Sequence, residues 1–229
     1  MNKYAKMFVP GGLKVPKELK KSRLFCAAKN FQAPKELILI GYCVPVDDQG
    51  QLPWCAAYSA ANYAENLLWR KRGYHQEINP APLYNYAKSI DGDPNGDGTY
   101  LECTLEALLK YGYFDSSVCK IKTIGGGTFG NNSALNDIKY AIHKYGVVMA
   151  GFNITDEWFN PKKGVVRGGG SSRGGHAVLI VGYDEDGVLI QNSWGASYAH
   201  DGFVYLTNRA FDEQFMYAAF LTRALDGLN

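Results

Sequence analysis

The sequence predicts an α+β protein with two lobes and a cleft between them. Two observations support this: helical spacing fills the first half of the chain, and short β-rich runs follow Gly146. With 229 residues and 46% hydrophobic content, the chain can bury one full core or two smaller ones. We expect a helical lobe over about residues 50–135 and a sheet or barrel lobe over about residues 136–225.

The clearest helix is predicted between Pro53 and Arg72. Its alanines recur every three or four residues, the last turn is basic, and Gly73 follows, which suits both the helix dipole and a C-terminal cap. Three more helices are expected at 82–89, 100–111 and 133–146, the last with Ser133 as its N-cap.

The expected strands are rich in β-branched and aromatic residues. They lie at 147–154, 176–183, 188–191, 203–207 and 216–221. The Gly-rich stretch 168–175 lacks the Gly-Lys-Ser/Thr ending of a phosphate-binding loop and leads into a strand. We therefore predict a mobile loop at the edge of the cleft.

Residues 1–33 form a basic arm in front of the remaining domain, residues 34–229. The arm carries a formal charge of +7 and the rest of the chain carries −5. Such an arm is either a solvated extension or a segment that docks on its own domain. The sequence leaves both alternatives open.

Bulk composition excludes several other classes of protein. The 24 basic and 22 acidic residues are too evenly balanced for a protein that coats nucleic acid, so no nucleic-acid partner is expected. The longest aliphatic run, 37–40, is too short to cross a membrane, and no signal peptide is visible. We expect a monomer, and the sequence does not indicate a compartment.

The chain contains five cysteines, so at least one thiol stays free within a monomer. If Cys55 is that thiol, the other four allow three pairings that the sequence cannot separate. These four are Cys26, Cys43, Cys103 and Cys119. The spacing of cysteine and histidine does not match a structural zinc site.

Three residues form a candidate reactive group. Cys55 lies at the predicted start of a helix, where unpaired N–H groups and the dipole favour a thiolate. His176 opens an apolar strand after the Gly-rich stretch, and Asn192 follows the next strand. An amide such as that of Asn192 can accept a hydrogen bond from a histidine ring and hold its tautomer, while Trp194 could cover that bond.

These residues belong to four motifs in a recognisable order. Gln49-Gly50 stands six residues before Cys55, and His176-Ala177 and Asn192-Ser193-Trp194-Gly195 follow much later. The sequence thereby resembles the papain family of cysteine peptidases over about residues 34–225. It departs from the family at Leu52, where a disulfide cysteine is usual.

The resemblance implies a papain-like two-lobe fold and hydrolysis of peptide bonds without a cofactor. It implies that the Cys55 thiolate attacks, His176 transfers protons, Asn192 orients His176, and Gln49 contributes to the oxyanion hole. Substrates would be peptides or proteins, with endopeptidase activity expected. The arm is shorter than a typical inhibitory prodomain of the family. From the charge split of +7 against −5, we nevertheless expect it to lie over the cleft as a short pro-like segment of a zymogen.

Two alternatives remain beside this expectation. One is a catalytically silent relative that binds peptides, and the other is an acyl transferase or ligase with the same thiol chemistry. Separately, the stretch from Asp91 to Glu102 has the spacing of an EF-hand calcium loop, although Gly98 replaces its usual apolar residue. The alternative for that stretch is a polar turn at the rim of the cleft.

Overall fold

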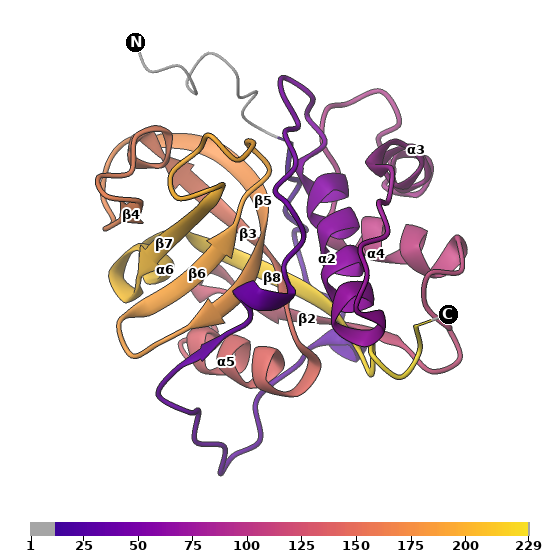
Figure 1. The fold of residues 1–229 in the computed structure, drawn as a ribbon, viewed down its shortest axis with the longest axis horizontal. Coiled ribbons are helices and arrows are strands. Elements are labelled where there is room, and N and C mark those ends of the chain that lie inside the picture. Colours follow the sequence, from indigo (N-terminus) through magenta and orange to yellow (C-terminus); the bar gives the residue numbers. More distant parts are fainter. Residues whose placement is uncertain (1–11, 229) are drawn as a thin grey trace.

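The computed structural model describes residues 12–228. One group of helices lies on one side of the molecule, and most of the sheet lies on the other, as Figure 1 shows. The helical lobe consists of α2 (Cys55–Arg72), α3 (Pro80–Ile90) and α4 (Leu101–Lys110). The predicted α+β architecture with two lobes is confirmed.

Helix α2 forms the wall of the helical lobe that faces the sheet. Nearly every residue from Cys55 to Leu68 is buried, and small alanines let the helix pack closely on strand β5 (Ser172–Tyr183). Ser59 Oγ donates to the Val178 carbonyl at 2.9 Å, so a buried hydroxyl joins the two lobes. Gly73 ends the helix with φ of +74°, and its N–H bonds to the Trp69 carbonyl, as the sequence predicts.

The sheet is antiparallel except for one parallel pair, β4 with β7. The short strand β1 (Leu37–Ile38) pairs with the end of β5. The order of the other strands is β2 (Lys120–Gly125), β8 (Phe215–Thr222), β3 (Val148–Thr155), β5, β6 (Gly187–Gln191), β7 (Phe203–Thr207) and β4 (Val165–Val166).

Two features differ from the sequence prediction. Strand β2 lies in the sheet although we predicted the sheet lobe to begin near residue 136. Strand β5 begins at Ser172, so the last part of the Gly-rich stretch is paired strand rather than a mobile loop, with Gly174 and Gly175 opposite Ile154 and Asn153.

Two further helices pack against the sheet, α5 (Ala134–Tyr145) and α6 (Asn208–Gln214). The first matches the predicted helix at 133–146, but Ser133 makes no side-chain cap bond. The second was not predicted. Within residues 12–228 there are also four short 3-10 helices: η1 (Lys21–Arg23), η2 (Ile40–Tyr42), η3 (Gly127–Phe129) and η4 (Asp156–Phe159).

The described part of the arm, residues 12–33, packs along the domain. The Phe25 N–H donates to the Thr123 carbonyl on β2 at 2.9 Å, and the Phe25 ring meets Phe220 edge-on at 5.0 Å. Arg23 pairs with Glu106 on α4 at 2.6 Å. Residues 1–11, which hold the rest of the predicted arm, lie outside the described residues.

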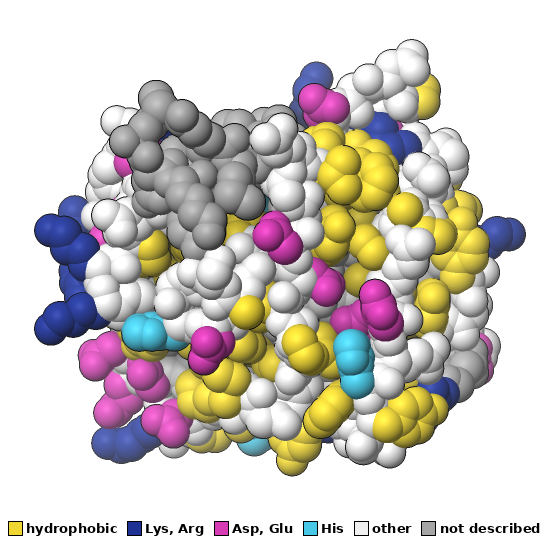
Figure 2. Space-filling view, turned by 45° about the horizontal axis from the view of Figure 1, so that its top comes forward, with side chains coloured by type: hydrophobic (Ala, Val, Ile, Leu, Met, Phe, Trp, Pro, Cys, Tyr) yellow, Lys and Arg dark blue, Asp and Glu magenta, His cyan; other side chains and the backbone are white. Residues whose placement is uncertain are grey.

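One face of the surface is shown in Figure 2, with hydrophobic side chains gathered over the helical lobe and charges of both signs scattered elsewhere. No helix among residues 12–228 is long and apolar enough to cross a membrane.

Candidate active site

Cys55 is the first residue of α2, which begins two residues later than the predicted start at Pro53, and its side chain is completely buried. Its own N–H has no acceptor within the helix because the first turn lacks preceding carbonyls. Trp54 precedes it without a side-chain cap. The sulfur therefore lies at the positive end of a helix, at the junction with the sheet.

His176 approaches the sulfur from the sheet. It lies within β5 opposite Phe152 rather than at the start of a strand, because β5 extends back to Ser172. The N–H of the adjacent Ala177 donates to Cys55 Sγ at 3.4 Å. Folding therefore brings two motifs more than a hundred residues apart into one buried contact.

Asn192 follows β6 and meets the histidine ring. Its Oδ1 lies 2.8 Å from His176 Nε2, and the same oxygen accepts the Ser193 N–H at 2.9 Å. Since Oδ1 can only accept, this contact places a proton on Nε2 of His176. The Trp194 ring stacks on the imidazole at 5.0 Å between centroids, which matches the predicted cover.

Gln49 is held next to this group by bonds to the Asn192 segment. Its Oε1 accepts from Ser193 Oγ at 2.6 Å, and its Nε2 donates to the Leu52 carbonyl at 2.9 Å. The Gln49 N–H also donates to the Ser193 carbonyl at 2.9 Å. The amide orientation is thus fixed, and the four predicted residues belong to one connected site.

Comparisons with known proteins agree with this arrangement. The sequence profile described as "Papain family cysteine protease" matches residues 39–218. The chain belongs to the papain family of cysteine proteases. Feline procathepsin L is 25% identical over 224 residues, which cover 86% of this chain and 67% of that protein. Cathepsin B-like cysteine proteinase 3 of Caenorhabditis elegans is 33% identical over 103 residues, 43% of this chain and 26% of the relative.

Solved structures of the papain-like fold superpose well. Xylellain, a cysteine protease from Xylella fastidiosa, has a TM-score of 0.70 at 17% identity, with 93% of this chain and 96% of that chain covered. Digestive procathepsin L 3 from Tenebrio molitor has a TM-score of 0.69 at 19% identity, covering 87% and 73%. These structures support the fold of this family member.

Burial changes the protonation of the two central groups. It raises the pKa of the Cys55 thiol to about 12, although backbone N–H groups of Ala177, Ala56 and Cys55 act in the opposite direction. Burial also lowers the pKa of His176 to about 4, against the effect of the Asn192 bond. Both groups are neutral at pH 7. The helix start lowers the pKa of the thiol as predicted, but loss of water is the larger effect here and the net pKa is raised.

A short piece of the arm lies against the buried thiol. Residues 12–15, which we call the tip, lie at the lobe junction. A Cβ built on Gly12 would lie 2.9 Å from Cys55 Sγ. Leu13 is 5% exposed, and a Cβ on Gly151 would come within 2.3 Å of its Cδ2. The tip thus contacts both the helical lobe and the sheet, directly beside the thiol.

The predicted calcium loop lies beside the tip. Asp91 and Asp93, which we call the acidic rim, both form ion pairs with the Lys14 ammonium. Asp91 also forms an ion pair with Lys88 at 2.8 Å. No group of three or more His, Cys, Asp or Glu side chains among residues 12–228 is arranged to hold a metal. Calcium binding at this loop stays a prediction that calorimetry can test.

A buried polar network, which the sequence did not reveal, supports the loop that carries Gln49. The Val44 N–H donates to Asn66 Oδ1 at 2.8 Å, and Asn66 Nδ2 donates to Gln191 Oε1 at 2.7 Å. Gln191 Nε2 closes the ring by donating to the Val44 carbonyl at 3.1 Å. It joins α2, the loop and β6 immediately before Asn192. Its only sequence signal was two amide side chains at positions predicted to have apolar surroundings, Asn66 within the alanine-rich helix and Gln191 at the end of a strand; both are buried in the structure.

All five cysteines lie among the described residues and carry free thiols. None of the three pairings left open by the sequence forms here. Cys26 is exposed, whereas Cys55 and Cys119 are buried. Differences in exposure, rather than disulfides, therefore distinguish these thiols.

Proposed function

We propose that this protein is a cysteine peptidase that hydrolyses peptide bonds within polypeptide chains. The observation that carries the proposal is the contact of Cys55, at a helix start, with the strand that holds His176, whose ring is bonded to Asn192. A thiol, an imidazole and an orienting amide in this order suit nucleophilic catalysis.

The proposed reaction begins when His176 accepts the Cys55 proton and the thiolate attacks the scissile carbonyl carbon. The Cys55 N–H and the Gln49 amide then donate to the oxyanion, each contributing about 3 kcal/mol to lowering the barrier. The imidazolium gives its proton to the departing amine as the C–N bond breaks, which leaves a thioester. Water, deprotonated by His176, attacks the thioester, and the C–S bond breaks to release the acid and the thiol.

Turnover of internally quenched peptides tests this proposal. We expect Cys55→Ala and Cys55→Ser to lose turnover while keeping the thermal stability of the parent. A matched control is Cys26→Ala, which removes an exposed thiol and should keep full activity. Unchanged turnover in the Cys55 variants would remove the nucleophile assignment.

Product analysis separates the alternatives. Mass spectrometry of the products should find water added across internal peptide bonds. Products joined to an added amine or thiol would indicate a transferase or ligase. Tight peptide binding without any cleavage would indicate a silent relative, and release of single terminal residues would indicate an exopeptidase.

We further propose that the tip blocks the site in the full chain, as a segment of the arm that docks on its own domain. The supporting observations are the complete burial of Cys55 and the 5% exposure of Leu13. Residues 25–27 of the arm are held elsewhere: Phe25 packs on Phe220, and the Ala27 N–H donates to Asp137 Oδ1 at 2.7 Å. The tip can therefore leave the site while residues 25–27 stay packed on the domain.

Leu13→Asp tests the blocking role. Burial of one leucine stabilises docking by about 1.5–3 kcal/mol, so loss of that contact should raise kcat/KM on small peptides by about tenfold or more. Leu24→Asp is the matched control, since Leu24 belongs to the same arm but is 45% exposed. Equal kcat/KM in the parent and Leu13→Asp would refute the blocking role.

A further inference from the structure

The tip is a peptide segment bound beside the proposed nucleophile, and its backbone is fixed. The Lys14 N–H donates to the Thr99 carbonyl at 3.0 Å, and the Thr99 N–H donates to the Gly12 carbonyl at 3.4 Å. Leu13 thereby forms a parallel bridge with Thr99. An extended peptide can pair with Thr99 through backbone bonds that do not depend on its side chains.

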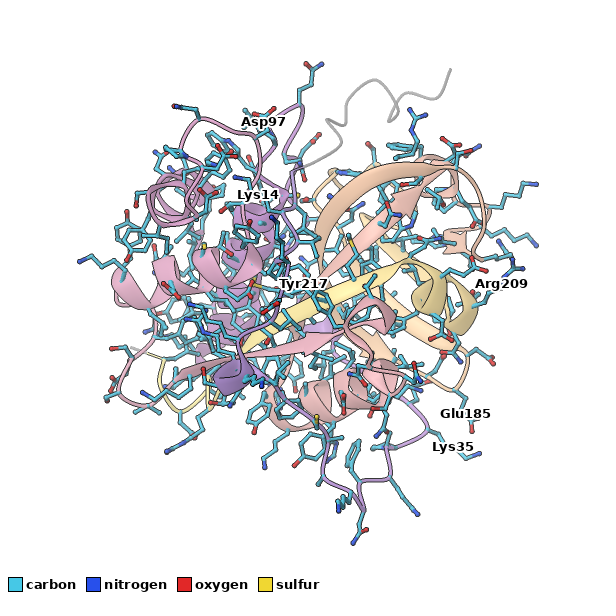
Figure 3. All side chains as sticks on the ribbon, turned by 180° about the vertical axis from the view of Figure 1, so that it is seen from behind. Lys14, Lys35, Asp97, Glu185, Arg209 and Tyr217 are labelled. Carbon is cyan, nitrogen blue, oxygen red and sulfur yellow. The ribbon has the colours of Figure 1, made fainter. Side chains whose placement is uncertain are left out.

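Two side chains of the tip lie in different environments, Leu13 in an apolar one and Lys14 in an acidic one. The leucine lies against the backbone of Gly151 and close to Tyr217, where the missing Cβ of Gly151 makes room for it. The neighbouring lysine points to the acidic rim: its Nζ lies 2.8 Å from Asp93 Oδ2 and 3.2 Å from Asp91 Oδ2. In Figure 3, Lys14 lies with Asp97 above Tyr217, near the junction of the lobes.

The charge balance at the rim favours a cation even without the tip. Asp91 keeps Lys88 as a partner, but Asp93, whose side chain is 56% exposed, has only Lys14 as its ion-pair partner among the described residues. Lys14 itself keeps 17% of its side chain exposed. Displacement of the tip therefore leaves two carboxylates with one ammonium group.

We propose that Asp91 and Asp93 make this site select peptides that carry lysine or arginine next to an aliphatic residue. The inference rests on the proposed peptidase function, because a substrate must displace the tip and take its place. A basic side chain then restores the ion pairs that Lys14 makes, a neutral one leaves Asp93 unpaired, and an acidic one is repelled.

The test needs peptides of both sequence orders, because a bound peptide can pair with Thr99 with its chain running in either direction. Gly12 lies at the sulfur, Leu13 follows it and Lys14 is next. The probes are therefore quenched peptides that contain Gly-Gly-Leu-Lys or Lys-Leu-Gly-Gly, each with matched versions in which Gln or Glu replaces Lys. The ratio of kcat/KM between matched peptides does not depend on how often the tip is open, because closure reduces both equally.

The expected ratio of kcat/KM for Lys over Gln is about three- to fivefold in at least one direction, as for a partly exposed ion pair. It should fall to about one in Asp93→Asn and shrink as salt rises. Asp91→Asn is the second variant, and its ratio should fall as well. Glu185→Gln is the charge-matched control, since Glu185 pairs with Lys35 on a distant part of the surface (Figure 3) and should keep the ratio.

Binding of the same peptides to the full-length Cys55→Ala variant, measured by fluorescence anisotropy, separates the two proposals. A Lys preference in binding with no hydrolysis by either the parent or Leu13→Asp would keep the selectivity and end the peptidase proposal. Hydrolysis with a Lys-to-Gln ratio of one in both directions would overturn the selectivity. The selectivity also fails if a preference persists unchanged in both Asp93→Asn and Asp91→Asn.

Discussion

The reactivity of Cys55 toward a small alkylating reagent should reveal whether the tip controls the site. Burial raises the pKa of this thiol from an ordinary value of 9.0 to about 12. A difference of three units reduces the thiolate fraction near neutral pH by about a thousandfold. Leu13→Asp should release the tip, readmit water and recover much of that reactivity.

The assay is iodoacetamide alkylation across pH 6 to about 10, a range that brackets the ordinary thiol pKa, with peptide mapping to follow each cysteine separately. For the parent chain we expect slow alkylation of Cys55 whose rate rises about tenfold per pH unit without levelling off. For Leu13→Asp we expect faster alkylation that levels off at lower pH. The exposed Cys26 provides an internal reference, with equal rates in both proteins.

The sign of the pH effect follows from the raised pKa. The closed state keeps its thiol proton to higher pH than the open state does, so opening releases a proton above the open-state pKa. Through this thiol, rising pH should therefore favour opening. Burial changes the pKa of His176 in the other direction, from an ordinary value of 6.5 to about 4, so opening takes up a proton between these pH values and falling pH through that range also favours opening. Identical profiles for Cys55 in the parent and Leu13→Asp, or rapid alkylation of the parent at neutral pH, would refute this reasoning.

Three further predictions concern the site and the fold. Gln49→Ala should lower kcat by about a hundredfold with unchanged stability, because one oxyanion donor is lost; an unchanged kcat in steady-state assays would exclude that role. Removal of residues 1–33 should lower the free energy of unfolding in urea titration by at least about 2 kcal/mol more than removal of residues 1–15 does, since only the longer deletion loses the Phe25 packing. Burial raises the pKa of Glu65 to about 7, so its charge costs stability as pH rises from 4.5 to 7. Glu65→Gln can still accept the Ile78 N–H and should raise stability by roughly 2 kcal/mol at pH 8 but little at pH 4; an equal gain at both would contradict the assigned pKa.

The sequence was sufficient for those parts of the site that depend on local motifs. Cys55 begins a helix because an alanine-rich stretch follows it, and this could be read directly from the spacing. The Asn192 segment also behaves as predicted, with the amide on the histidine and Trp194 stacked on the ring. Such features can be predicted from the residues near them in the chain together with one correct pairing of strands.

The rest depends on contacts between distant residues. Strand β2 was missed although Lys120 and Lys122 alternate with buried Ile121, a short period-two pattern that a helical first half obscured. The seating of Leu13 requires the absence of a side chain at Gly151, more than a hundred residues away. No local rule relates these positions.

The thiol pKa is another property that local rules could not give. A helix start favours the thiolate, and this effect was predicted from the position of Cys55 alone. The opposing loss of water comes from the tip, β5 and the neighbouring helix residues together, and here it is the larger effect. The electrostatics of a buried group depend on the whole surrounding structure.

Trapping of the acyl-enzyme determines whether Cys55 is the nucleophile. Leu13→Asp is mixed with a reactive peptide ester, quenched in acid within the first turnover, and digested for mass spectrometry. We predict that the acyl group is attached to the peptide containing Cys55 and that the adduct accumulates more slowly when His176 is replaced by alanine. An acyl group on another cysteine, or hydrolysis without any adduct at position 55, would contradict the account.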